Sequence, residues 1–200
     1  MLAMTLTGRR AGAVLVILSA ALLAWSAGVP AADPVRQYVD EVTAASITVA
    51  VEPLIFARER SDLAANSRDY VTLTAIEVNV QGKRSYLWSA YIWSTIDRRD
   101  RQQLVAPGDE LVLVADGRPI ALRSDAKTLR EHGIGQSPTR APVRTAVPAL
   151  FAADLESIGY VARASELHIE LIHAGSNDAF VLWKDGRAAL SAFTASVGGG

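Results

Sequence analysis

Residues 70–96, YVTLTAIEVNVQGKRSYLWSAYIWSTI, decide the fold of this chain. Two runs rich in β-branched and aromatic residues, 70–80 and 85–96, flank the glycine-containing segment 81–84. Such residues favour strands, and a glycine turn between two of them favours antiparallel pairing. We therefore expect a long hairpin. Apolar residues alternate onto both faces of the second run, which indicates a central strand that is covered on both sides.

Strand-like segments also occur on either side of this hairpin. Segment 47–51 alternates and continues into 54–56 across Pro53, where a proline favours an edge or a bend. Segment 133–148 contains three prolines and two glycines. We interpret it as a long surface crossing that leads into a short strand at 147–151.

Two more hairpins are expected in the second half of the chain. Asp116 and Gly117 separate two apolar runs, and both residues tolerate the positive φ angles of a two-residue hairpin turn. Segments 167–172 and 179–183 form the third pair, because apolar and polar residues alternate in the first and a Gly-Ser-Asn-Asp turn precedes the second.

Helical spacing of apolar residues follows Asp154 and Asp185, and we expect each of these carboxylates to cap a helix. A third, short helix is expected at 124–132, before Gly133. Strands that dominate the chain, with helices that come late in it, predict an α+β fold. Its antiparallel β-sandwich-like sheet would carry two helices in the C-terminal half.

The N-terminus has the pattern of an export signal. Arg9 and Arg10 precede an apolar or small-residue run at 11–28, and Val29 and Ala31 fit the small residues expected at a cleavage site. The sequence therefore predicts a signal peptide. The expected location of the mature protein is periplasmic or secreted.

This interpretation sets the domain organisation, with a signal peptide at 1–31 and a single globular domain at 32–200. The apolar run has 18 residues, which is near the lower limit for crossing a bilayer. The alternative is therefore an uncleaved segment that anchors the protein in the inner membrane, and the membrane would be contacted only there.

Composition excludes several chemistries. The chain has no cysteine, so it forms no disulfide, thiolate metal site or cysteine nucleophile. The predicted mature chain loses two of the 20 basic residues and none of the 21 acidic ones, so its net charge is −3. A net negative charge argues against nucleic acid as a partner.

Aromatic residues of the central hairpin are the first candidate site. Tyr91 and Trp93 share one face of the second run, whereas Trp88 projects from the other. Flat rings bind sugars or apolar peptide groups when they are exposed, and fill the core when they are buried. We take Tyr91 and Trp93 as the candidate ligand-binding residues, with a role in the core as the alternative.

His168, Glu170 and Asp178 are the second candidate site. The first two share one face of a predicted strand, and Asp178 lies across the following turn. Imidazole and carboxylate groups together suit a divalent metal. The alternative is a solvated strand face that carries polar residues by alternation.

No nucleophile elbow, zinc-protease helix or calcium loop occurs in the sequence. We assign no catalytic residue and expect no cofactor. The expected function is a non-catalytic binding or structural module of the cell envelope, with an envelope protein as the candidate partner. The alternatives are a periplasmic hydrolase or metal-dependent enzyme, and a membrane-anchored accessory subunit.

Overall fold

The fold is built on one antiparallel sheet. The structure, a computed structural model, describes residues 33–96, 110–123, 127–173 and 176–199, so the predicted signal peptide lies outside the described residues. The strands are β1 (Val35–Val39), β2 (Ser46–Ala50), β3 (Leu54–Glu59), β4 (Arg68–Val80), β5 (Lys83–Ser94), β6 (Glu110–Ala115), β7 (Arg118–Leu122), β8 (Val147–Ala153), β9 (Leu167–His173) and β10 (Ser176–Lys184). The helices are η2 (Arg130–His132), α2 (Leu155–Arg163) and α3 (Arg187–Gly198).

The expected central hairpin is confirmed as β4 paired with β5. Val80 pairs with Lys83, so only Gln81 and Gly82 form the turn, and both have positive φ. This two-residue turn is tighter than the expected segment 81–84. Ten successive residues of β4 are buried, which places the strand inside the sheet with both faces covered.

The outer edge of β4 is shared by two strands. β3 pairs with the first half of β4 and β2 with the second half. The two strands are separate because the extended segment is interrupted at Pro53, which lies between them. β1 then adds to β2, while β10, β9, β6 and β7 follow β3. On the other side, β8 pairs with β5.

The two ends of this strand order approach each other. The amide of Ala152 in β8 donates a hydrogen bond of 3.1 Å to the carbonyl of Arg123, just after β7. The sheet therefore folds over itself in a sandwich-like way. Together with the two late helices this confirms the α+β class with an antiparallel sheet.

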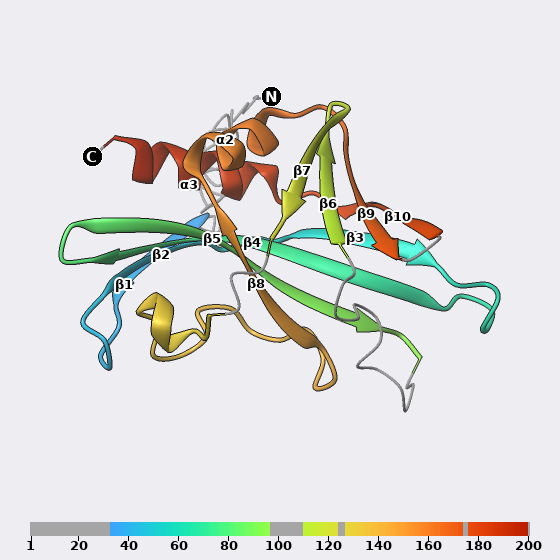
Figure 1. Cartoon of the computed structure of the whole chain (residues 1–200), viewed down its shortest axis with the longest axis horizontal. Coiled ribbons are helices and arrows are strands. Elements are labelled where there is room, and N and C mark those ends of the chain that lie inside the picture. The colour runs from blue at the N-terminus through green and yellow to red at the C-terminus, as the bar shows by residue number, and fades with distance from the viewer. Residues whose placement is uncertain (1–32, 97–109, 124–126, 174–175, 200) are drawn as a thin grey trace, which may run out of the picture. The chain divides into compact units, whose positions relative to one another are not determined.

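Two apolar cores lie on opposite faces of the β4–β5 hairpin. The larger one takes residues from β2 to β10 and from both α-helices, with Phe56, Trp88 and Phe193 among the fully buried side chains. The smaller one packs Ile134 and Leu129 against β2, β4 and β5. Figure 1 shows the same arrangement, with α2 and α3 on one side of the hairpin and the segment around η2 on the other.

The helix caps differ from each other. Asp154 caps α2 as expected and accepts a hydrogen bond of 2.7 Å from the amide of Ser157. At α3 the N-cap is Gly186 and not the expected Asp185, but the Asp185 carboxylate accepts hydrogen bonds of 2.9 Å from both the amide and the Nε of Arg187, the first residue of the helix. No helix within the described ranges is both long and apolar enough to cross a membrane.

The remaining local expectations are partly confirmed. Asp116 and Gly117 have positive φ and close the β6–β7 hairpin. Of the short helix expected at 124–132, only the single turn η2 occurs among the described residues, and 124–126 lie outside them. The crossing that follows contains no helix or strand before β8. β1 was not expected at all, because its sequence VRQYV has no strong apolar alternation.

Candidate functional site

A row of directly paired residues crosses the outer face of the sheet, the face opposite the α-helices. It runs from Trp93 through Tyr70, Ala57 and Val181 to His168. Directly opposite residues of an antiparallel pair project from the same face. The structure thus places Trp93 and His168, one from each candidate site, on the same face. Four strand spacings, or about 19 Å, separate them.

Three aromatic rings gather at one end of this row. Tyr70 stacks on Trp93 with ring centroids 4.1 Å apart, and its other neighbour is the edge-on ring of Trp183 at 6.4 Å. Trp183 is 56% exposed and the adjacent Val181 is 61% exposed. We call Tyr70, Trp93, Val181 and Trp183 the aromatic face.

The position of Trp183 depends on a register shift in β10 and on the cationic side chain of Arg68. The pairing of β10 with β3 shifts register between Leu182 and Lys184, at the tryptophan itself. The guanidinium carbon of Arg68 lies 4.6 Å from the centre of the Trp183 ring, and Arg68 is ion-paired to Glu59 at 2.9 Å. The ring is therefore held in place although it is exposed to solvent.

Tyr91, the other candidate aromatic residue, is in a different environment. Its ring is buried, and its hydroxyl donates a hydrogen bond of 3.0 Å to the carbonyl of Thr139. The side chains of Ser89 and Thr139 also bond to each other at 3.0 Å. Tyr91 thus anchors the crossing to the sheet, whereas Trp93, two residues further on, is only half-buried.

Trp93 also borders a wide groove of about 1120 Å³ between the end of β5 and the crossing. We call this depression the Trp93 groove. Its lining consists of Trp93, Ser94, Thr95, Arg140, Ala141, Pro142, Val143, Arg144 and Thr145. The groove lies where β5 has passed its last pairing with β8, at Ile92 and Val147.

Comparison of the chain with protein-family models, curated proteins and solved structures finds no match. The functional argument therefore rests on the geometry of these residues.

The three candidate metal ligands do not come together. His168 Nε2 lies 3.5 Å from Glu170 Oε1 on the outer face. Asp178 pairs with Leu171 and so projects from the opposite face, where it forms an ion pair with Arg58. Among the residues that the structure describes, no group of three or more His, Cys, Asp or Glu side chains is placed to hold a metal ion.

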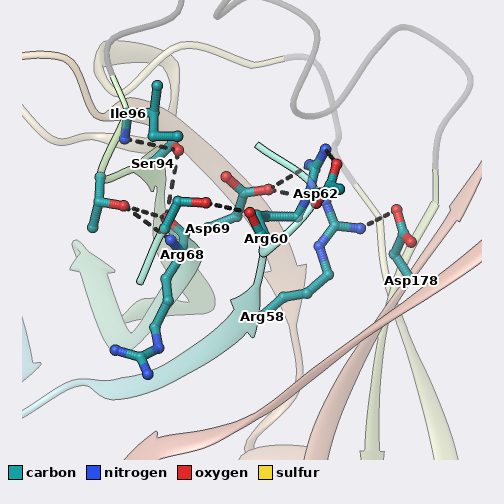
Figure 2. A network of polar contacts seen from close by, with 10 residues as sticks. Arg58, Arg60, Asp62, Arg68, Asp69, Ser94, Ile96 and Asp178 are labelled. Atoms are coloured by element: carbon teal, nitrogen blue, oxygen red, sulfur yellow. Dashed lines mark hydrogen bonds and ion pairs between the residues drawn. The ribbon is translucent and has the colours of Figure 1, made fainter. Parts of the chain in front are cut away.

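Figure 2 shows a charged cluster on the inner face that the sequence did not indicate. Asp69 is fully buried, and its Oδ2 accepts hydrogen bonds of 2.9 Å from both Arg58 and Arg60. Arg58 also pairs with Asp178, and Arg60 with Asp62. The cluster ties β3, β4 and β10 together at the end of the core away from the helices.

The electrostatics of this cluster indicate a structural role. Burial alone would raise the pKa of Asp69, but hydrogen bonds from Arg58, Ser94 and Arg60 outweigh it and hold the pKa below its usual range. A carboxylate of this kind is ionised at neutral pH and is a weak base. Asp69 Oδ1 and Arg58 Nε are buried without a hydrogen-bond partner, so part of the desolvation cost remains.

Sequence reasoning found Trp93 but missed Tyr70 and Trp183. The pairing of Tyr70 with Trp93 follows from the turn at Gln81 and Gly82, so the exact turn length was the missing signal. Trp183 joins the group through the pairing of β10 with β3, in which the paired residues are more than 120 positions apart in the sequence. No local pattern indicates a contact at that separation.

Proposed function

We propose that this chain is an exported, non-catalytic binding module of the cell envelope, and that its aromatic face binds saccharides. The observation that carries the proposal is an exposed tryptophan, Trp183, held beside the stacked rings of Tyr70 and Trp93. Tyr70 is itself buried, but Trp183 and Val181 are exposed side by side, and neighbouring exposed apolar side chains can mark an interaction site. The three rings come from three strands, so the surface is rigid before a ligand arrives.

Saccharide is the ligand class that this surface suits. The C–H groups on one side of a sugar ring pack against the flat face of an aromatic side chain, while its hydroxyls remain available for hydrogen bonds. Arg68 and Glu59 place polar groups at the margin of the aromatic face. Tyr91 contributes indirectly, because it anchors the crossing beside Trp93.

Export is supported by the N-terminal sequence. The arginine pair and the apolar run at 11–28 form the expected signal, with cleavage after Ala31. Intact-mass measurement on protein from the envelope fraction of cells that express the full chain should show an N-terminus near Ala32. An intact Met1 in the membrane fraction would instead support the anchored accessory subunit.

The saccharide proposal can be tested by native electrophoresis in gels that contain soluble neutral or acidic polysaccharides. The wild-type protein should be retarded by at least one of them. Trp183→Ala should abolish most of the retardation, since it removes the most exposed ring. Val39→Ala is the control, because Val39 is 65% exposed but lies on β1, outside the aromatic face.

Two outcomes would count against the proposal. Equal retardation of the wild type and Trp183→Ala would show that the aromatic face is not the binding surface. If no polysaccharide retards the protein and a stoichiometric envelope protein co-purifies with it, the ligand is that protein and the saccharide proposal is wrong.

A further inference from the structure

The Trp93 groove carries two positively charged side chains. Two arginines, Arg140 and Arg144, line it, and no acidic residue occurs among the described residues of the lining. Both arginines are exposed, and within the described ranges neither forms an ion pair. By contrast, Arg58 on β3, Arg60 just after it and Arg68 on β4 are each paired with a carboxylate.

Positive charge of this kind attracts anions. A guanidinium group without a carboxylate partner offers several N–H donors in one plane, which match the two oxygens of a carboxylate. Two such groups beside one groove also raise the local potential, although the chain as a whole carries a formal charge of −1. The charge of the two arginines therefore suits the groove to an anionic ligand.

The backbone that carries the first arginine is fixed to the sheet. The carbonyl of Thr139 accepts the Tyr91 hydroxyl, and the carbonyl of Pro138 accepts a hydrogen bond from Arg36. Arg140 follows directly after these two anchored residues. Its main chain is thus held beside β5 before a ligand binds, which lowers the entropy lost on binding.

Trp93 supplies the second element of recognition. One face of its ring stacks on Tyr70, and the residue also lines the groove, so the aromatic face and the groove meet at this side chain. Thr145 belongs to the same lining, as do Ser94 and Thr95, whose hydroxyls donate hydrogen bonds to the carbonyl of Arg68. An aromatic ring beside two guanidinium groups that no described carboxylate pairs with offers the contacts that a sugar ring with a carboxylate would use.

We propose that the Trp93 groove binds an acidic saccharide, a chain of uronate rings whose carboxylates pair with Arg140 and Arg144 while a ring packs on Trp93. This inference rests on the proposed saccharide function and names its substrate class. The groove is wide and open, with a volume of about 1120 Å³, so its shape suits an extended chain of sugar rings.

The test uses protein purified after expression of the full chain and titrated calorimetrically with two uronate trimers, trigalacturonate and trimannuronate. Galactotriose and mannotriose are the neutral counterparts. At least one uronate should bind ten-fold or more tightly than its neutral counterpart. The double variant Arg140→Gln/Arg144→Gln should lose that ten-fold preference and keep its affinity for the neutral trimer.

The control is Arg130→Gln/Arg163→Gln, which removes the same charge at two exposed arginines outside the groove and should bind like the wild type.

Wild-type affinity in the groove variant would overturn the inference. So would equal binding of the uronate and neutral trimers, but the saccharide function would then stand. If no trimer binds and only neutral polysaccharides retard the protein, the acidic class alone is wrong; if no trimer binds and no polysaccharide retards it, the saccharide function fails as well.

Discussion

At the scale of single residues, Asp69 shows how much a buried charge depends on its partners. The carboxylate is fully removed from water, and Arg58 and Arg60 both donate to the same oxygen. Removing one partner from such a cluster leaves the other charges buried and uncompensated. Asp69 is therefore expected to matter for stability and not for ligand binding, since it lies on the inner face of the sheet.

Asp69→Asn keeps the shape of the side chain and removes its charge. We expect it to lower the free energy of unfolding by about 3 kcal/mol, because Arg58 and Arg60 lose their buried counter-ion. Urea unfolding followed by circular dichroism measures the change. Asp62→Asn is the matched control: Asp62 also pairs with Arg60 but is 60% exposed, so it should cost less than about 1 kcal/mol. Equal losses in the two variants would contradict this account.

The same carboxylate should make stability depend on pH. The folded state holds the pKa of Asp69 below its ordinary value of 3.8, so the unfolded chain binds the proton more readily. The stabilising contribution is present above about pH 4 and is lost as the pH falls through the lower pKa of the folded state. The free energy of unfolding, measured at pH 7, 5 and 3, should fall less between pH 7 and pH 3 in Asp69→Asn than in the wild type. Parallel profiles would contradict the prediction.

At the scale of elements, turn length and helix starts decide which side chains meet. The turn at Gln81 and Gly82 pairs Tyr70 with Trp93. A four-residue turn at 81–84 would have paired Tyr70 with Thr95, and the ring stack would not form. The start of α3 is set by close packing. Gly186 lies against the backbone of Pro53, the residue at which the extended segment is interrupted between β2 and β3.

Gly186→Ala tests that contact. A Cβ atom at this position would lie 2.5 Å from the carbonyl oxygen of Pro53, and backbone cannot move aside cheaply. We expect a loss of about 1–3 kcal/mol in the free energy of unfolding, as for other overpacked sites. Gly198→Ala is the control at the far end of α3, where a Cβ meets nothing within 4 Å, and it should be neutral or slightly stabilising. A neutral Gly186→Ala would show that α3 can shift away from Pro53.

At the scale of the whole molecule, Asp33–Gly200 form one compact unit. The larger core contains residues from nearly every strand and from both helices, so no part of the sheet keeps its packing when another part is removed. The two cores also share β4 and β5, whose opposite faces they cover. Cooperative behaviour follows from this sharing.

Unfolding of this unit should be a single transition. Far-UV circular dichroism reports the sheet, and fluorescence reports tryptophans that include the buried Trp88 and the exposed Trp183. The two urea curves should coincide, with the same midpoint and slope. Separate midpoints would show that part of the sheet unfolds on its own.

The sequence by itself determined the local elements of this protein. Strand alternation, the Asp116-Gly117 turn, the Asp154 cap and the late helices follow from backbone preferences and side-chain period within a few residues. Those preferences also sufficed for the α+β class, because hairpin turns join neighbouring strands in antiparallel pairs. Alternation also identified Trp93 as a candidate, since it assigns the residues of one strand to its two faces without any knowledge of the other strands.

Only the tertiary structure decided which elements lie beside each other. The placement of β10 against β3 brings Trp183 to Tyr70 and sends Asp178 to the inner face, away from His168 and Glu170. The crossing that buries Tyr91 and carries the groove arginines is likewise located by packing and not by local preference. Such contacts join residues far apart in sequence, and their energy comes from burying a shared core, which no short segment of the chain encodes.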